Sequence, residues 1–391
     1  MRVNVLWRLL LACLMLTMAA CSTISGWFSS DDYEAPPSPL VTFKPEFEPK
    51  VVWSVDTGKG ANNAYTDLGA WLQDDKLFTV DYEGDVSSYQ ADNGKKIWET
   101  ELDVSVEAGA GGGDGLIMIG TRDGQVIALD EKTGKKLWKQ SLTSEVLAPP
   151  KVAKGIVVVR SADGRLSGLS AKDGSTVWSY QRAVPLLTLR GVGAPVIDGD
   201  KVFAGYDSGK MVALSLADGK LVWEKSVAIP RGRTEMERLV DIDADPVVKN
   251  GVVYAVSYQG KLAALSEDTG NILWSHDMSS RTGLAVAPGA AIYVSDDSDY
   301  VWAIQDGSGD SLWRQTRLLR RKISAPAIAG KYVVVGDFEG YLHWIARSDG
   351  RFVARQQISD SPIVSQPIVY KGLIYVTSND GTLTAVQVPA K

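Results

Sequence analysis

Cysteine and histidine are scarce in this chain of 391 residues, which contains two of each. Both cysteines, Cys13 and Cys21, precede the globular part of the sequence. The folded body therefore has no disulfide, no thiol nucleophile and no cysteine-based metal site, which excludes several classes of enzyme. His276 and His343 both fall in expected strands, and we interpret each as a structural residue.

Basic residues are fewer than acidic ones. The chain has 41 Lys and Arg residues against 47 Asp and Glu residues, and its net charge is −6. The sequence has no basic cluster or stripe of the kind that follows a phosphate backbone. Nucleic acid is therefore not an expected partner.

The first twenty residues have the features of an export signal, with Arg2, Arg8, no acidic residue and an apolar run too short to span a bilayer. The run ends in MAAC, which resembles the lipobox at which bacterial lipoproteins are cut and lipid-modified, here at Cys21. Ordinary cleavage that leaves Cys21 as a bare thiol is the alternative. Ser22 follows in place of an aspartate, so the resemblance implies an outer-membrane lipoprotein that faces the periplasm.

Three segments follow from this organisation. Residues 1–20 are the expected lipoprotein signal peptide. Residues 21–50 are rich in Ser, Pro and acidic residues without an apolar period, and we expect a lipidated cysteine followed by a flexible tether. Residues 51–391 form the expected folded body.

The sequence of the folded body consists of repeated units. A recurring part of the unit is seen in LDEKTGKKLW, LSAKDGSTVW, LSLADGKLVW and LSEDTGNILW. Successive first positions of the unit are 40, 40, 45, 51, 39, 41 and 41 residues apart, beginning at Gly84 and ending at Gly381. Apolar residues alternate with a period of two, as in GQVIALD, which indicates about four short strands in each unit. Units of this length are typical of propeller blades. We therefore predict an all-β fold, an eight-bladed β-propeller of four-stranded antiparallel blades.

The last repeat is incomplete, and the VVWSVD segment that contains Trp53 precedes the first one. We predict that this amino-terminal strand pairs with the last blade and closes the ring, which leaves no free sheet edge there. The tryptophan at the end of each unit is expected to dock one blade on the next. These structural residues are Trp53, Trp98, Trp138, Trp178, Trp223, Trp274 and Trp313, while the seventh unit has Ala354 in that place.

Two short motifs invite a ligand-binding interpretation that their context does not support. DIDAD, residues 241–245, is similar to the start of a calcium loop, but Pro246 and Val252 stand where glycine and glutamate are required. GAGGGDG, residues 109–115, is followed by an expected strand and not by a helix that could face a phosphate. We expect no metal, no cofactor and, at 109–115, a flexible connection.

The repeat resembles that of quinoprotein dehydrogenases, eight-bladed propellers that bind pyrroloquinoline quinone and calcium. This resemblance implies the alternative function, a dehydrogenase. The whole chain more closely resembles the BamB family, non-enzymatic lipoproteins of the outer-membrane β-barrel assembly machinery. The matching segments are PLLTLRG (185–191), TEMERLVDIDADPVV (234–248) and GDFEGYLHWI (336–345).

The first two of these segments fall in the two longest repeats, on adjacent blades, and connections of that kind emerge on one face of a propeller. The resemblance implies a docking patch for the periplasmic domains of the central subunit BamA. Its residues are Leu187, Leu189, Arg190, Asp241 and Asp243. Exposed leucines would be apolar anchors and the arginine a forked donor. The alternative is that the leucines pack beneath a loop and Arg190 pairs with Asp241 or Asp243. An exposed strand edge could also accept an extended peptide, so nascent barrel proteins remain a second class of partner.

Overall fold

The computed structural model describes residues 35–61, 66–185, 187–189 and 193–388. Contacts divide the chain into two units, Met1–Pro37 and Ser38–Lys391. The described residues of the first unit have no regular secondary structure. The expected signal peptide and Cys21 lie outside the described residues.

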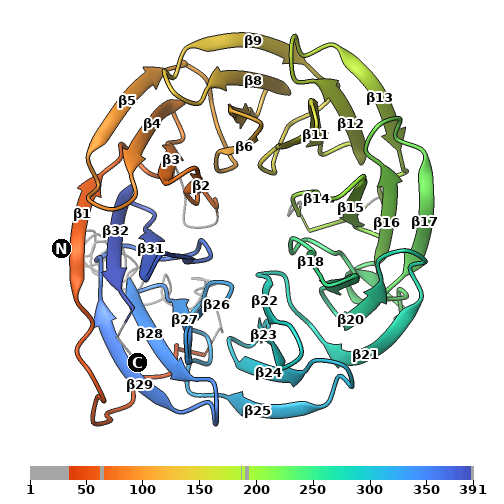
Figure 1. The fold of residues 1–391 in the computed structure, drawn as a ribbon. Coiled ribbons are helices and arrows are strands. Elements are labelled where there is room, and N and C mark those ends of the chain that lie inside the picture. Colours follow the sequence, from red (N-terminus) through yellow and green to blue (C-terminus); the bar gives the residue numbers. More distant parts are fainter. Residues whose placement is uncertain (1–34, 62–65, 186, 190–192, 389–391) are drawn as a thin grey trace, which may run out of the picture. The chain divides into compact units, whose positions relative to one another are not determined.

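The second unit is a ring of antiparallel sheets (Figure 1). Six sheets have four strands each, and one has eight, formed by β6–β9 and β10–β13. Within each group of four, every strand pairs with its neighbour in the sequence, apart from the group that β1 completes. The only helix among the described residues is the short 3-10 helix η2 (Met236–Arg238). This arrangement is a β-propeller, which confirms the predicted architecture at that level.

The two strands nearest the centre of the ring open each group. The first strands are β2 (Trp71–Gln73), β6 (Gly111–Gly113), β10 (Lys151–Ala153), β14 (Val196–Asp198), β18 (Val247–Lys249), β22 (Leu284–Ala287), β26 (Ala327–Ala329) and β30 (Ile368–Tyr370). The second strands are β3 (Lys76–Val80), β7 (Leu116–Gly120), β11 (Ile156–Arg160), β15 (Lys201–Tyr206), β19 (Val252–Val256), β23 (Ala291–Ser295), β27 (Tyr332–Gly336) and β31 (Leu373–Thr377).

The third and fourth strands lie toward the perimeter. The third strands are β4 (Asp85–Gln90), β8 (Gln125–Asp130), β12 (Arg165–Ser170), β16 (Lys210–Ser215), β20 (Gly260–Ser266), β24 (Val301–Gln305), β28 (Tyr341–Ala346) and β32 (Thr382–Gln387). The outer strands are β5 (Lys96–Glu101), β9 (Lys136–Ser141), β13 (Thr176–Gln181), β17 (Leu221–Ser226), β21 (Ile272–Met278), β25 (Ser311–Gln315), β29 (Phe352–Gln357) and β1 (Val51–Asp56).

Burial along the strands follows from this layering. All five residues of β7 are buried, because sheets on both sides cover the second strand of a group. The outer strand β9 is instead exposed or half-buried along its length. The core therefore consists of layers between successive sheets, which is why the second and third strands contain runs such as VIAL in β8.

Seven tryptophans of the outer strands contact the next sheet in the ring. A Cβ added to Gly134 would lie 2.5 Å from the ring of Trp98, so the glycine leaves the space that the indole fills. Trp98 Nε1 also donates a hydrogen bond to Glu131 O at 2.9 Å. Equivalent contacts join the pairs Trp53–Gly94, Trp138–Gly174, Trp178–Gly219, Trp223–Gly270, Trp274–Gly309 and Trp313–Gly350.

The repeat with Ala354 has its tryptophan on the adjacent strand. Trp344 of β28 lies across the ladder from Ala354 of β29, and both are fully buried. In the β6–β9 group the small residue is on the third strand, where Ala128 faces Trp138. The sheet after β29 is completed by β1, so it has no turn between third and outer strands on which an outer-strand tryptophan could stack.

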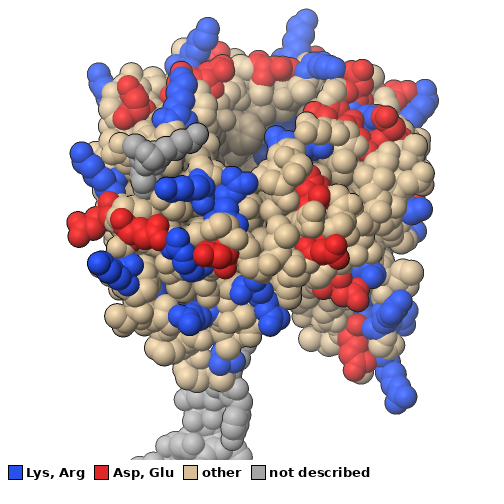
Figure 2. Space-filling model, turned by 60° about the horizontal axis from the view of Figure 1, so that its bottom comes forward, with Lys and Arg blue, Asp and Glu red and all other residues tan. Residues whose placement is uncertain are grey.

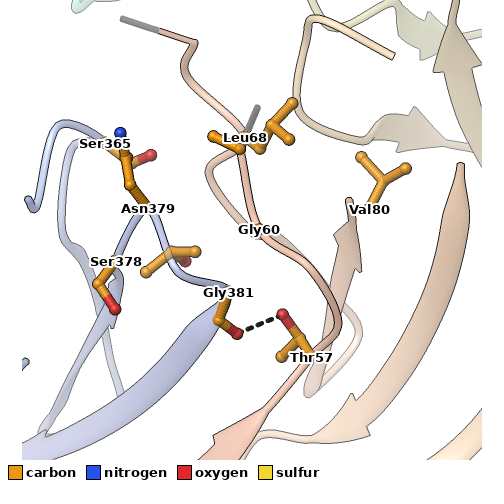
Figure 3. A pocket seen from close by; sticks show the side chains of 10 residues that line it. Thr57, Gly60, Leu68, Val80, Ser365, Ser378, Asn379 and Gly381 are labelled. Atoms are coloured by element: carbon orange, nitrogen blue, oxygen red, sulfur yellow. Dashed lines mark hydrogen bonds between the residues drawn. The ribbon is translucent and has the colours of Figure 1, made fainter. Parts of the chain in front are cut away.

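The two ends of the folded body meet in one sheet. β1 pairs antiparallel with β32, and Trp53 lies opposite Ala385. Beside this seam the Thr57 hydroxyl donates to Gly381 O at 2.6 Å (Figure 3). The cavity there, which Leu68 also lines, has a volume of about 10 Å³, enough for about one water molecule.

Residues 38–50, which we call the strap, pack along β29. Glu46 N donates to Val353 O at 2.8 Å, and residues 46 and 47 form a bend there. The ring of Phe47 meets Trp344 edge-on, with 6.1 Å between centroids. The prediction of a flexible tether was wrong for this segment, because its aromatic residues find apolar partners on the folded body.

The glycine-rich run at 109–115 was expected to be flexible but contains β6. This strand pairs in parallel with β10, where Lys151 lies opposite Gly112. A Cβ on Gly111 would lie only 1.9 Å from Pro150 O. The glycines therefore allow two inner strands to approach closely.

Candidate partner-binding site

Two long connections between an outer strand and the next inner strand meet on one side of the ring. One joins β13 to β14 and the other joins β17 to β18. The second connection lies against turns between second and third strands, because Ile242 N donates to Tyr206 O at 3.3 Å and Tyr258 N to Asp241 O at 2.8 Å. Loops of adjacent sheets thus form one surface, which we call the two-loop patch.

Among the residues that the structure describes, two hydrogen bonds join the connections. The backbone N–H of Leu189 donates to Asp241 Oδ2 at 2.6 Å. The N–H of Ala194 donates to Asp245 Oδ1 at 2.5 Å. The first bond joins two of the five predicted docking residues, Leu189 and Asp241, and Leu187 and Asp243 are each two residues from one of these. The fifth, Arg190, lies outside the described residues.

The four residues differ in how accessible they are. Leu187 is 39% exposed. Leu189 and Asp243 are half-buried. Asp241 is 0% exposed, so its carboxylate is beneath the surface. Asp241 therefore is not a surface contact. It is a brace, by which we mean that it holds the leucine-bearing loop in place from beneath.

Burial determines the charge state of this acidic pair. Burial raises the pKa of Asp241 to about 6, against the opposing effect of the hydrogen bond from Leu189 N. Burial, with the negative charges of Asp241 and Asp207, raises the pKa of Asp243 to about 8. Both oxygens of Asp243 are buried without a hydrogen-bond partner among the described residues. At neutral pH the Asp243 carboxyl is therefore largely protonated and able to donate.

Arg160 supports the two-loop patch from below. Its side chain is 1% exposed. Nη2 lies 3.1 Å from Asp207 Oδ1, and Nη1 donates to Gly193 O at 3.3 Å in the β13–β14 connection. The guanidinium lies 5.0 Å from the centre of the Tyr206 ring. This buried pair fixes one end of the loop that carries Leu187.

The structure adds apolar residues that the sequence did not single out. Ile229 is 66% exposed and Met236 is 65% exposed, both on the β17–β18 connection. Met236 lies on η2, where Glu237 Oε2 accepts the N–H of Thr234 at 3.2 Å and Glu237 N donates to the Thr234 hydroxyl at 3.2 Å. This Thr-x-x-Glu capping box was the available signal. It holds an apolar side chain outward in an otherwise charged segment.

The two histidines lie in strands, His276 on β21 and His343 on β28. His343 is fully buried, with Nε2 2.8 Å from Asp337 Oδ2, and Nδ1 accepts from Arg355 Nε at 3.2 Å. Burial lowers the pKa of His343, against the opposing effect of Asp337. Both ring nitrogens are thus engaged within the core. His276 packs edge-on against Trp302.

The described residues include no group of three or more His, Cys, Asp or Glu side chains placed to hold a metal ion. In the same residues, no helix is long and apolar enough to cross a membrane. On the face seen in Figure 2, acidic and basic side chains are intermingled.

The fold defines the class, a β-propeller with two long connections joined to each other by a hydrogen bond. The model of the family described as outer membrane protein assembly factor BamB matches residues 82–315 and 301–389. This chain belongs to that family.

Relatives and solved structures agree with this placement. The BamB of Pseudomonas aeruginosa is 46% identical over 368 residues, 94% of this chain and 97% of that protein. The BamB of Escherichia coli is 37% identical over 369 residues, 92% of this chain and 94% of that protein. The crystal structure of BamB from Moraxella catarrhalis has a TM-score of 0.80 at 29% identity, and the match covers 87% of this chain and 99% of that one.

A quinohemoprotein alcohol dehydrogenase from Comamonas testosteroni has a TM-score of 0.69 at 14% identity, over 88% of this chain and 77% of that one. This likeness concerns the fold alone. The predicted alternative, a quinoprotein dehydrogenase, gains no support beyond the shared architecture.

Proposed function

We propose that this chain is a non-catalytic scaffold of the outer-membrane β-barrel assembly machinery and assists the insertion of β-barrel proteins. Family membership supports this function, since the relatives are named outer membrane protein assembly factors and align along most of their length. The architecture we propose is an eight-bladed propeller, in which β6–β9 and β10–β13 are separate blades whose inner strands share one ladder pair, Gly112 with Lys151. Such a ring is a rigid platform for loops.

The proposed partner is BamA, bound through its periplasmic domains at the two-loop patch. The observation that carries this proposal is the bond from Leu189 N to Asp241 Oδ2, because it holds a loop with an exposed leucine in a defined position. Leu187 and Leu189 would enter apolar pockets of the partner, with Arg190 and Asp243 as polar contacts. Asp241 would act through Leu189, as a positioning residue.

The proposed location is the outer membrane, with the folded body in the periplasm. Acyl chains on Cys21 would hold the protein there, because each buried methylene contributes about 0.8 kcal/mol and several chains together bind durably. Substitution Cys21→Ser should release folded protein into the soluble periplasmic fraction. Retention of that variant in membranes that lack its partners would contradict the proposed anchor.

Co-purification from detergent-solubilised outer membranes tests the partner contact. Leu187→Ala should weaken BamA binding by about 2 kcal/mol, the range of an interface hot spot. The matched control is Leu312→Ala on β25, which also truncates an exposed leucine, 52% accessible, but lies outside the two-loop patch. Wild-type recovery of BamA by Leu187→Ala would remove this residue from the interface.

A further inference from the structure

Every outer strand contains one extra residue that has no partner in its ladder. In β9, Trp138 pairs with Ala128 and Lys136 pairs with Leu129, so Leu137 is left out of register. Such a β-bulge turns the extra residue away from regular pairing. The extra residues of the outer strands are Val52, Ile97, Leu137, Val177, Val222, Leu273, Leu312 and Val353.

One of these aliphatic residues is covered and the other seven are not. The exposed fractions of the seven range from 41% for Ile97 to 56% for Leu273. Val353 is 0% exposed. The difference is the strap, which donates a backbone hydrogen bond from Glu46 to Val353 O and adds Phe47 to the same apolar cluster. The strap therefore shows how a segment of chain covers a bulged outer edge.

Two cations flank Val353 and hold the strap. Arg351, two residues before the bulge, forms an ion pair with Glu46. Arg355, two residues after it, donates from Nη1 to the backbone carbonyl of Val41 at 3.1 Å and lies 5.1 Å from the centre of the Phe43 ring. The site thus holds a segment that contains aromatic and acidic residues.

Leu137 on β9 has the same arrangement without an occupant among the described residues. Lys135 precedes it by two positions and Lys139 follows it by two, and both are exposed. In the described part of the chain neither lysine forms an ion pair. The other six exposed bulges lack this pair of cations, as at Val177, which lies between Ser175 and Ser179.

We infer that the outer edge of β9 around Leu137 is a docking site for an extended segment of another polypeptide that carries aromatic and acidic residues. The segment would add along the edge strand, whose outward N–H and C=O groups are available for β-augmentation. Its apolar residue would cover Leu137, and its acidic residue would meet Lys135 or Lys139. β9 is an outer strand at the top of the ring in Figure 1, so this site does not depend on the proposed contact at the two-loop patch.

The test uses the mature full-length protein in detergent and a fluorescent peptide, VTFKPEFEPK, which copies residues 41–50. The wild type should bind the peptide saturably. Leu137→Asp should weaken binding by about tenfold, and so should a double change of Lys135 and Lys139 to glutamate. The matched control is Val177→Asp, the same change at a bulge without the lysines, and it should bind like the wild type. A peptide with both phenylalanines replaced by alanine should not bind.

A photo-reactive phenylalanine in the peptide identifies the edge that it occupies. Cross-links to β9 support the inference. Cross-links confined to β29 would mean that the peptide only displaces the strap, and they would overturn it. Equal loss of binding in the Leu137→Asp and Val177→Asp variants, or no loss in either, would also overturn it.

Discussion

Leu189 and Asp241 are 52 residues apart in sequence and joined by a hydrogen bond of 2.6 Å from backbone N–H to carboxylate. The bond links the connections of two adjacent sheets. Asp241 is 0% exposed. Burial of a carboxylate without a hydrogen bond would destabilise the fold, and the bond from Leu189 N offsets part of that cost. A loop held in this way presents its apolar residue with little loss of conformational entropy on binding.

Replacement of this brace should loosen the loop. Asp241→Ala removes the acceptor and leaves the N–H of Leu189 unpaired, which costs about 1–3 kcal/mol of folding stability. Binding of BamA should fall as well, because Leu187 is no longer held in position. Urea unfolding and co-purification measure the two effects. Glu235→Ala, an exposed acid in the same connection, is the control, and an Asp241→Ala variant that matched it in both assays would contradict the positioning role.

Stability should depend on pH through Asp243. Its pKa is about 8 in the folded chain, because of burial and the nearby charges of Asp241 and Asp207, and near 3.8 without them. A raised pKa contributes stability that is fully present below the unfolded value and is lost as pH rises through the folded one. The melting temperature of the wild type should therefore fall as pH rises from the unfolded pKa of 3.8 toward the folded pKa of about 8, and should level off above it.

The variant Asp243→Asn cannot ionise, so its melting temperature should decline less over the same interval. Thermal unfolding from about pH 6 to about pH 9 is the measurement. Asp123→Asn, at an exposed turn residue, controls for general effects of charge. Parallel curves for the wild type and Asp243→Asn would show that Asp243 does not carry the dependence.

Truncation of two neighbouring residues of β9 should have very different effects on folding stability. Trp138→Ala leaves a void over Gly174 and removes the bond from Nε1 to Ala171 O, and it should cost about 3–5 kcal/mol of folding stability. Leu137→Ala, one residue earlier and 49% exposed, should change stability by no more than about 0.5 kcal/mol. Denaturant unfolding compares them. Similar losses for both would mean that the tryptophan does not dock the sheets.

The strap should contribute to the stability of the ring. Phe47→Ala removes a half-buried ring that packs on Tyr332 and Trp344, at a cost of about 2 kcal/mol. Glu48→Ala, one residue on and exposed, should be neutral. Thermal unfolding of the full-length chain separates the cases. If Phe47→Ala has the same melting temperature as the wild type, the strap behaves as the tether that the sequence predicted.

The sequence by itself determined the repeat and, with it, the β-propeller. Period-two runs such as VIAL and glycines such as Gly134 act over a few residues, and the same local rule recurs in each unit. Neighbouring strands in sequence are neighbours in space, so local chemistry specifies most of the ring. The pairing of β1 with β32 also followed from the sequence, because an incomplete last repeat and an unpaired first strand complete each other.

Only the tertiary structure decided which residues each surface displays. Nothing local to DIDAD distinguishes the buried brace Asp241 from a surface acid, since its depth depends on a loop 52 residues away. In one repeat the tryptophan is Trp344 on the third strand, and Ala354 stands on the outer strand. This arrangement likewise depends on the next sheet, which has no turn between its third and outer strands. The strap looks flexible from its composition and is ordered because its phenylalanines meet β28 and β29, about 300 residues later. Contacts between distant segments carry no periodic signal, and so they appear only when the ring is assembled.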